Sequence, residues 1–269
     1  MKKTVLVLIT FALVIAVAGS GFWLVHYFID SREQRQTYEN LAEEFVLEST
    51  PSVRPENSSS LDSSLDAGEN DVSSPVESPD TPPRHDLAAL AAENPDCAGW
   101  LTIPDAGIDY PVMHTPNDPE HYLRRDFYGD SASGGTPFLD GRNLAETENQ
   151  NLIVYGHNMM DGSMFKPLIS YLEPSFQETH KEIYLELSEK QYRYELVTIL
   201  ETNTQCSLYQ YTDLSDPAEE SDFRAAILKE TDLDGVHQAS GYLTLSTCNN
   251  GGGNSRVLVI AALAGEVSA

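Results

Sequence analysis

Short runs rich in apolar, β-branched and aromatic residues dominate the chain after residue 85. Two of them, residues 183–187 and 192–200, alternate apolar and polar positions around a turn at Ser188-Glu189-Lys190, which predicts a β-hairpin. The pattern predicts further strands at residues 98–103, 108–112, 151–155, 242–247 and 257–263. Many short strands with few helices favour a closed or nearly closed β-barrel, which leaves no exposed strand edge.

Two helical patterns interrupt these strands, at residues 164–172 and 216–230. In the second, Phe223, Ala226 and Ile227 fall on one helical face. Residues 85–269 together have the size of one ordinary domain.

The amino terminus carries the longest apolar run. Residues 4–29 are almost wholly apolar and exceed the ~20 residues that a helix needs to cross a bilayer. Lys2 and Lys3 precede this run. The positive-inside rule therefore predicts a single-pass anchor at residues 1–30, with a cytoplasmic amino terminus and an extracytoplasmic domain. A cleaved signal peptide is the alternative, because Ala16-Val17-Ala18 resembles a cleavage site. The apolar run continues well beyond that point, which favours the retained anchor.

Two segments separate the anchor from the β-rich part. In residues 31–48, Tyr38, Leu41 and Phe45 recur at helical spacing, which predicts a juxtamembrane helix that either packs on the domain or acts as a spacer. Residues 49–84 are rich in Ser and Pro and carry seven acidic against two basic side chains. Such a segment buries too little apolar surface to offset its ordering entropy. We expect it to form a disordered acidic stalk, extended by self-repulsion.

Charge and cysteine usage narrow the function classes. The chain has 42 Asp and Glu against 16 Lys and Arg, which argues against nucleic acid as a partner, since phosphate binding needs a basic footprint. The three cysteines, Cys97, Cys206 and Cys248, form no CxxC pair, so a zinc site of the usual kind is not expected. An odd count in an exported protein leaves at least one thiol that needs a chemical explanation.

Cys248 ends a predicted strand and precedes a loop of Asn and Gly. A thiol at a rigid strand tip beside a flexible loop suits a nucleophile, although a free cysteine is more often a buried core residue. If the loop returns antiparallel, Arg256 lies beside Cys248 at the same end of the sheet. A guanidinium there favours the thiolate and donates to an oxyanion. The alternative for Arg256 is a solvated charge at a strand end.

His157 follows the predicted strand 151–155, where it can face a neighbouring strand tip. A cysteine nucleophile needs an acid that protonates the leaving amine, and histidine titrates near physiological pH. His26 lies in the anchor, and loop or surface positions are expected for His85, His114, His121, His180 and His237.

These motifs together resemble one family. Thr244-Leu245-Ser246-Thr247-Cys248 matches the TLxTC motif of sortases, with an arginine on the following strand, and Tyr155-Gly156-His157 matches the family's histidine region. The resemblance covers residues 100–263 and keeps the order His, Cys, Arg. It implies a mainly β fold, the closed eight-stranded sortase barrel with a few short helices, behind an amino-terminal transmembrane helix.

The resemblance also implies the roles of individual residues. Cys248 is expected to be the nucleophile, His157 the general acid and base, and Arg256 the group that steadies substrate and oxyanion. Ser246 and Thr247 are expected to contact substrate. The predicted helix at residues 216–230 and the run at residues 156–165 resemble class B sortases in particular. The short loop between Cys248 and Arg256 departs from that class, so no substrate contact is carried over from it.

The implied activity is transpeptidation. A class B-like sortase would cleave a carboxy-terminal sorting signal after Thr through a thioacyl-enzyme and transfer the protein to an amine. Its partners would be surface proteins or pilins that bear the signal, a peptidoglycan precursor or pilin amine as acceptor, and the membrane. Neither a metal nor an organic cofactor is expected. Two alternatives stay open: an extracytoplasmic cysteine peptidase or hydrolase that uses the same three residues, and a non-catalytic binding module on a stalk.

Overall fold

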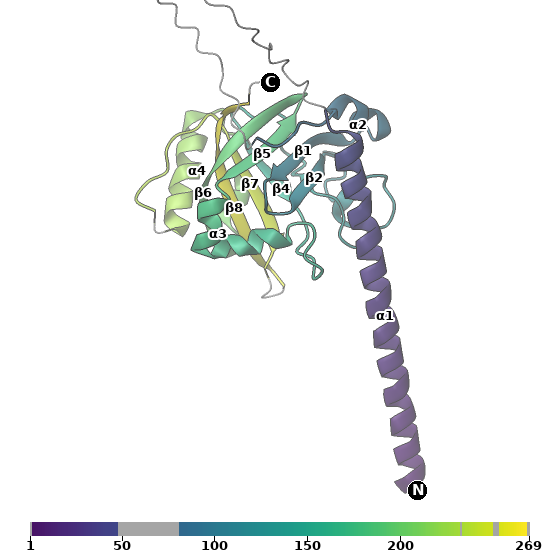
Figure 1. Cartoon of the computed structure of the whole chain (residues 1–269). Coiled ribbons are helices and arrows are strands. Elements are labelled where there is room, and N and C mark those ends of the chain that lie inside the picture. The colour runs from purple at the N-terminus through teal and green to yellow at the C-terminus, as the bar shows by residue number, and fades with distance from the viewer. Residues whose placement is uncertain (1, 48–80, 232, 250–252, 268–269) are drawn as a thin grey trace, which may run out of the picture.

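The computed structural model describes residues 2–47, 81–231, 233–249 and 253–267. Eight strands close into a barrel in the order β1-β2-β3-β4-β7-β8-β6-β5 (Figure 1). They are β1 (Cys97–Ile103), β2 (Ile108–Met113), β3 (Phe138–Leu139), β4 (Asn151–Tyr155), β5 (Glu182–Leu187), β6 (Lys190–Asn203), β7 (Tyr242–Cys248) and β8 (Ser255–Glu266). The closed eight-stranded barrel predicted from the sequence is confirmed.

The strand that the sequence pattern missed is β3. It has only two residues, too few to show alternation, yet it closes the barrel between β2 and β4. Phe138 pairs with Met113 in parallel and with Tyr155 antiparallel. The seven predicted strands correspond to the other seven, within a few residues at each end.

Helices decorate the barrel. They are α2 (Leu87–Glu93), η1 (His121–Arg124), η2 (Lys166–Leu172), α3 (Pro174–Thr179), η3 (Ser207–Gln210) and α4 (Pro217–Glu230), where η denotes a 3₁₀ helix. The predicted helix at residues 216–230 is α4, and its N-cap Asp216 accepts a hydrogen bond from the Ala218 amide at 2.9 Å. The pattern at residues 164–172 forms the 3₁₀ helix η2, which α3 follows.

Two apolar clusters lie on either side of the β7–β8 sheet. Leu243 and Leu245 of β7 point into the barrel interior, while Tyr242 faces the outer cluster, where Phe223 and Ile227 of α4 are buried. Because successive side chains of a strand point to opposite faces, Cys248 at the end of β7 lies on the same face as Tyr242.

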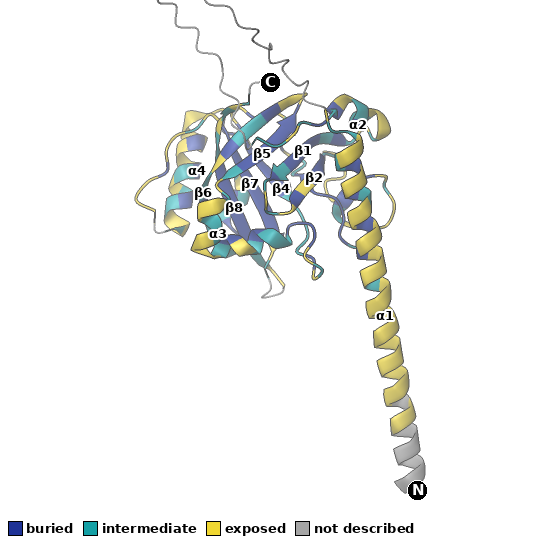
Figure 2. Cartoon of the chain, in the orientation of Figure 1, coloured by how far each residue is buried: buried dark blue, intermediate teal, exposed yellow. Residues whose placement is uncertain are grey.

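The amino-terminal part is one continuous helix, α1 (Lys2–Glu44), which runs through the predicted anchor and ends four residues before the predicted end of the juxtamembrane helix at residue 48. Its first half carries exposed large apolar side chains, such as Phe22 and Trp23, and its apolar stretch is long enough to cross a membrane (Figure 2). Its last turns pack on the barrel, where Tyr38 and Leu41 are each 1% exposed. The juxtamembrane part therefore docks on the domain and is not a spacer.

Most of the acidic stalk predicted at residues 49–84 lies outside the described residues, which omit residues 48–80. The chain on its two sides is paired: the Leu47 amide donates to the Arg84 carbonyl, and the Asp86 amide donates to the Phe45 carbonyl, both at 2.7 Å. The described residues on the two sides of this segment therefore lie side by side at the end of α1, and α1 reaches the barrel through direct packing.

His85 shows that one expectation was wrong. It was expected at a loop or surface position, but its side chain is 2% exposed, and its Nδ1 lies 2.7 Å from Oε1 of Glu186, which is 3% exposed. The ring also stacks on Trp100, with 4.1 Å between ring centroids. Burying the pair together satisfies both polar groups, which residue type and spacing alone do not reveal.

Candidate active site

The cysteines differ sharply in environment. All three lie in the described part of the chain and none forms a disulfide; Cys97 and Cys206 are buried, while Cys248 is exposed. Burial raises the pKa of the Cys97 thiol to about 12, which keeps that thiol protonated and unreactive. Every residue of β7 from Tyr242 to Thr247 is buried, so the strand holds Cys248 rigidly and presents it to solvent.

Arg256 faces Cys248 across the sheet. β7 and β8 run antiparallel, and their register pairs Cys248 with Arg256, as expected from the short return between them. The guanidinium Nη1 donates to the Ser255 carbonyl at 2.9 Å and to the Gly253 carbonyl at 3.2 Å. The Arg256 side chain is partly exposed, so its charge is not fully solvated, and the strand register places the residue directly opposite Cys248.

His157 reaches the same edge from the other neighbour of β7. β4 and β7 are parallel and pair Tyr155 with Ser246, so His157 and Cys248 each lie two residues past a paired position. Hydrogen bonds tie the two strand ends together: the Gly156 amide donates to the Ser246 carbonyl at 3.1 Å, and Thr247 Oγ1 donates to the Gly156 carbonyl at 2.8 Å.

Two further groups fix the segment that carries His157. The side-chain amide of Asn158 donates to the Cys248 carbonyl at 2.8 Å, which joins the histidine segment directly to the cysteine. A Cβ at Gly156 would lie 2.6 Å from the ring of Phe165, so only glycine lets this ring pack beneath the turn. Asn158 did not stand out in the sequence, because its partner is a main-chain carbonyl.

The electrostatics of His157 follow from its surroundings. Partial burial lowers the pKa of the imidazole below its ordinary value, and the nearby cations Arg124 and Arg256 add to this lowering. The Leu123 carbonyl, 2.8 Å from Nε2, acts in the opposite sense because it favours the protonated ring. A carbonyl can only accept, so Nε2 carries a proton and Nδ1 is the basic nitrogen of the neutral ring.

Ser246 and Thr247 already have protein partners. Each is 2% exposed; Ser246 Oγ lies 2.7 Å from the hydroxyl of Tyr209, and Thr247 bonds Gly156. Their assignment as substrate contacts stays a prediction, since both hydroxyls are occupied within the fold.

A network of charged and polar side chains contacts the end of β4, close to His157. Arg142 forms an ion pair with Asp140 at 2.7 Å and donates to the Tyr209 carbonyl at 2.8 Å, while the Tyr155 hydroxyl donates to Asp140 at 2.9 Å. Burial alone would raise the pKa of the Asp140 carboxyl, but the hydrogen bonds from Arg142 and Tyr155 hold it below its ordinary value. The network joins three segments of the chain, and no sequence motif marked it.

The barrel matches one family of known proteins. Residues 101–264 match the model of the sortase domain family. Sortase B of Listeria monocytogenes is 34% identical over 169 residues, which cover 62% of this chain and 68% of that relative. Sortase B of Staphylococcus aureus is 25% identical over 267 residues, which cover 96% of each chain.

Solved structures give the same result. Sortase B from B. anthracis in complex with AAEK1 has a TM-score of 0.65 and 25% identity, over 88% of this chain and 99% of that one. The Staphylococcus aureus sortase B-substrate complex has a TM-score of 0.60 and 27% identity, over 68% of this chain and 85% of that one.

Proposed function

Because this chain belongs to the sortase family of cysteine transpeptidases and is most similar to its class B members, we propose that it cleaves a carboxy-terminal sorting signal after threonine and transfers the protein to an amine. One observation carries the assignment of its site: the exposed thiol of Cys248 lies between Arg256 on one neighbouring strand and His157 beyond the other.

In the first acyl transfer, the Cys248 thiolate attacks the threonine carbonyl carbon and forms a tetrahedral adduct. The C–N bond then breaks, the imidazolium of His157 gives a proton to the leaving amine, and a thioacyl-enzyme remains. Nδ1 makes this transfer, because Nε2 is engaged with the Leu123 carbonyl. In the second step His157 takes a proton from the incoming amine, whose nitrogen attacks the thioester and releases the thiolate.

Arg256 donates to the oxyanion of each tetrahedral adduct. A fixed donor at that position is worth about 3–4 kcal/mol in the transition state. In the free enzyme its Nη1 is bonded to the Ser255 and Gly253 carbonyls, which holds the guanidinium in place, and the N–H groups of Nη2 and Nε are the donors proposed for the oxyanion.

The proposed partners lie at the membrane. Exposed apolar side chains on the first half of α1 suit a bilayer, and Lys2 and Lys3 favour a cytoplasmic amino terminus. The barrel edge where β7 ends and β8 begins lies on the same side of the molecule as the amino-terminal half of α1 (Figure 1). That arrangement suits surface proteins or pilins whose own membrane tails hold the sorting signal nearby, and a peptidoglycan precursor or pilin amine as acceptor.

The test uses the full-length chain in detergent micelles with a quenched fluorescent peptide library. We expect the strongest cleavage at Thr–Gly or Thr–Asn bonds, and diversion of the acyl-enzyme to a ligated product when an amine nucleophile is added. Cleavage without threonine preference, or without amine incorporation, would instead identify a hydrolase. No turnover, with a Cys248 no more reactive toward iodoacetamide than the buried thiols, would leave a binding module.

A further inference from the structure

The docked part of α1 forms hydrogen bonds with one main-chain segment, Gly134–Gly135, which lies in the loop between η1 and β3. Gln34 brackets that segment: its Oε1 accepts from the Gly134 amide at 3.2 Å, and its Nε2 donates to the Gly135 carbonyl at 2.7 Å. The Tyr38 hydroxyl donates to the same carbonyl at 2.9 Å. Gln34 and Tyr38 are 9% and 1% exposed, so these bonds are shielded from water and costly to leave unmade.

Gly135 in turn lies directly against the backbone of Leu123. Its φ is +59°, and a Cβ there would lie 2.5 Å from the Leu123 carbonyl oxygen. The next residue, Thr136, donates its amide to the Tyr122 carbonyl at 3.1 Å, which fixes the spacing of the two segments. A shift of Gly135 is therefore transmitted to the carbonyl that accepts the His157 Nε2 proton.

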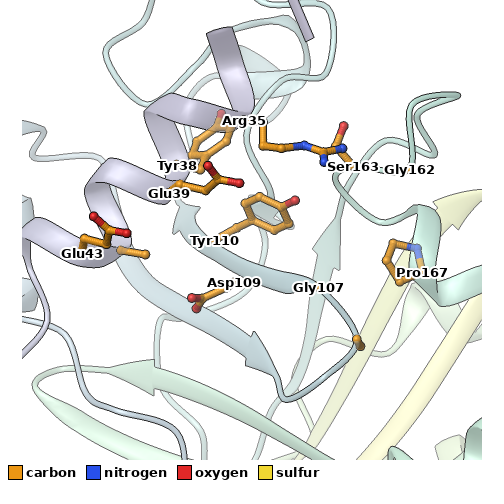
Figure 3. A pocket seen from close by; sticks show the side chains of 12 residues that line it. Arg35, Tyr38, Glu39, Glu43, Gly107, Asp109, Tyr110, Gly162, Ser163 and Pro167 are labelled. Atoms are coloured by element: carbon orange, nitrogen blue, oxygen red, sulfur yellow. The ribbon is translucent and has the colours of Figure 1, made fainter. Parts of the chain in front are cut away.

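A second contact reaches the loop that carries His157. Arg35 extends from α1 toward the loop around Ser163, beside a cavity of about 460 Å³ (Figure 3). Its Nη2 donates to the Asp161 carbonyl at 3.2 Å and lies 3.7 Å from the Asp161 carboxylate. The far end of the same loop returns to His157, whose carbonyl accepts the Phe165 amide at 2.8 Å.

We propose that Gln34 and Tyr38 of the juxtamembrane helix are positioning residues for His157. They hold Gly135 in place, Gly135 holds the Leu123 carbonyl, and that carbonyl fixes the tautomer and orientation of the imidazole. The proposal rests on the proposed role of His157 as general acid and base. It makes the segment next to the membrane part of the working enzyme, because a chain without the docked helix loses the support behind its proton donor.

The variants are made in the full-length chain in detergent micelles. Gln34→Met removes the polar atoms at nearly constant size, Tyr38→Phe removes the hydroxyl, and the double variant removes all three bonds to the Gly134–Gly135 segment. Gln36→Met is the matched control: Gln36 is exposed on the same helix and bonds Asn40 of that helix at 2.9 Å. Turnover is measured with the best-cleaved peptide of the fluorescent library, and the imidazole ¹⁵N and ¹³C resonances of His157 are followed by NMR.

We expect the double variant to lose about 10-fold in kcat with KM within about twofold, as a displaced general acid should. His157 should no longer be held as the Nε2–H tautomer, and its pKa should fall, because the acceptor that favours its protonated form is displaced. The cations that face His157, Arg124 and Arg256, are unchanged in these variants. Gln36→Met should match the wild type, and iodoacetamide should label Cys248 at the same rate in every variant.

Wild-type kcat and a wild-type His157 tautomer in all three folded variants would overturn the proposal. If the double variant does not fold, the single variants decide by the same two measurements. If the wild-type chain turns over no peptide, the proposed function fails, but the NMR measurement still decides whether the helix holds the imidazole.

Discussion

The main-chain carbonyl of Leu123 lies 2.8 Å from Nε2 of His157, and this single contact sets the chemistry of the ring. It assigns one proton to Nε2 and leaves Nδ1 to exchange protons with substrate. It also favours the protonated form of the ring, whereas partial burial and the nearby cations Arg124 and Arg256 favour the neutral form.

Removal of the nucleophile should abolish turnover and leave the fold intact. We expect Cys248→Ala to lower kcat/KM by at least ~10⁴-fold, measured by peptide fluorescence, because the two other thiols are buried. Its melting temperature should match the wild type, since the side chain is exposed. In the wild type, iodoacetamide should label Cys248 and spare Cys97 and Cys206. Residual turnover near the wild-type rate would place the nucleophile elsewhere.

Arg256→Lys should keep the charge and lose the planar fork of donors. We expect kcat/KM to fall by about 100-fold, the scale of one lost oxyanion donor. The control is Arg193→Lys, which changes an arginine of the same sheet that is ion-paired with Glu182 at 2.6 Å and should leave the rate unchanged. Equal rates for the two variants would make Arg256 a solvated strand-end charge.

His157 should make stability depend on pH in a defined direction. Its pKa in the folded chain is below the ordinary value of 6.5, so the unfolded chain binds more protons as the pH falls through 6.5. The free energy of unfolding should therefore decrease on acidification, and His157→Gln should lack this contribution. We would measure the free energy of unfolding in urea at about pH 7.5 and about pH 5, and we expect it to fall more for the wild type than for His157→Gln at the lower pH. If acidification instead destabilises the variant more than the wild type, the pKa of His157 in the folded chain is raised and not lowered.

Gly135→Ala should destabilise the chain by more than backbone strain alone. The new Cβ would meet the Leu123 carbonyl oxygen at 2.5 Å, in addition to the strain of φ +59°. Gly129→Ala is the control in the same loop, because its φ is +85° and no atom lies within 4 Å of the added Cβ. We expect losses of roughly 3 kcal/mol or more for Gly135→Ala and about 1 kcal/mol for Gly129→Ala, from chemical denaturation. Similar losses of unfolding free energy in the two variants would mean that the backbone at Gly135 can move away from Leu123 at little cost.

The sequence by itself determined the barrel strands and the order of the reactive residues. Alternating and apolar runs mark seven strands, because each buries one face or both against the core, and local composition records that burial. The pairing of Cys248 with Arg256 was also predictable, since a short loop between two strands leaves little choice but an antiparallel return.

Only the tertiary structure decided what surrounds those residues. The parallel pairing of β4 with β7 joins segments about ninety residues apart and brings His157 to the cysteine, and the two-residue β3 closes the barrel without any pattern of its own. Every residue has a main-chain carbonyl whatever its side chain, so no sequence pattern could identify the Leu123 carbonyl as the partner of His157. The choice between a docked helix and a spacer was likewise open, because Tyr38 and Gln34 find their partners a hundred residues away at Gly135, through contacts that helical spacing alone does not encode.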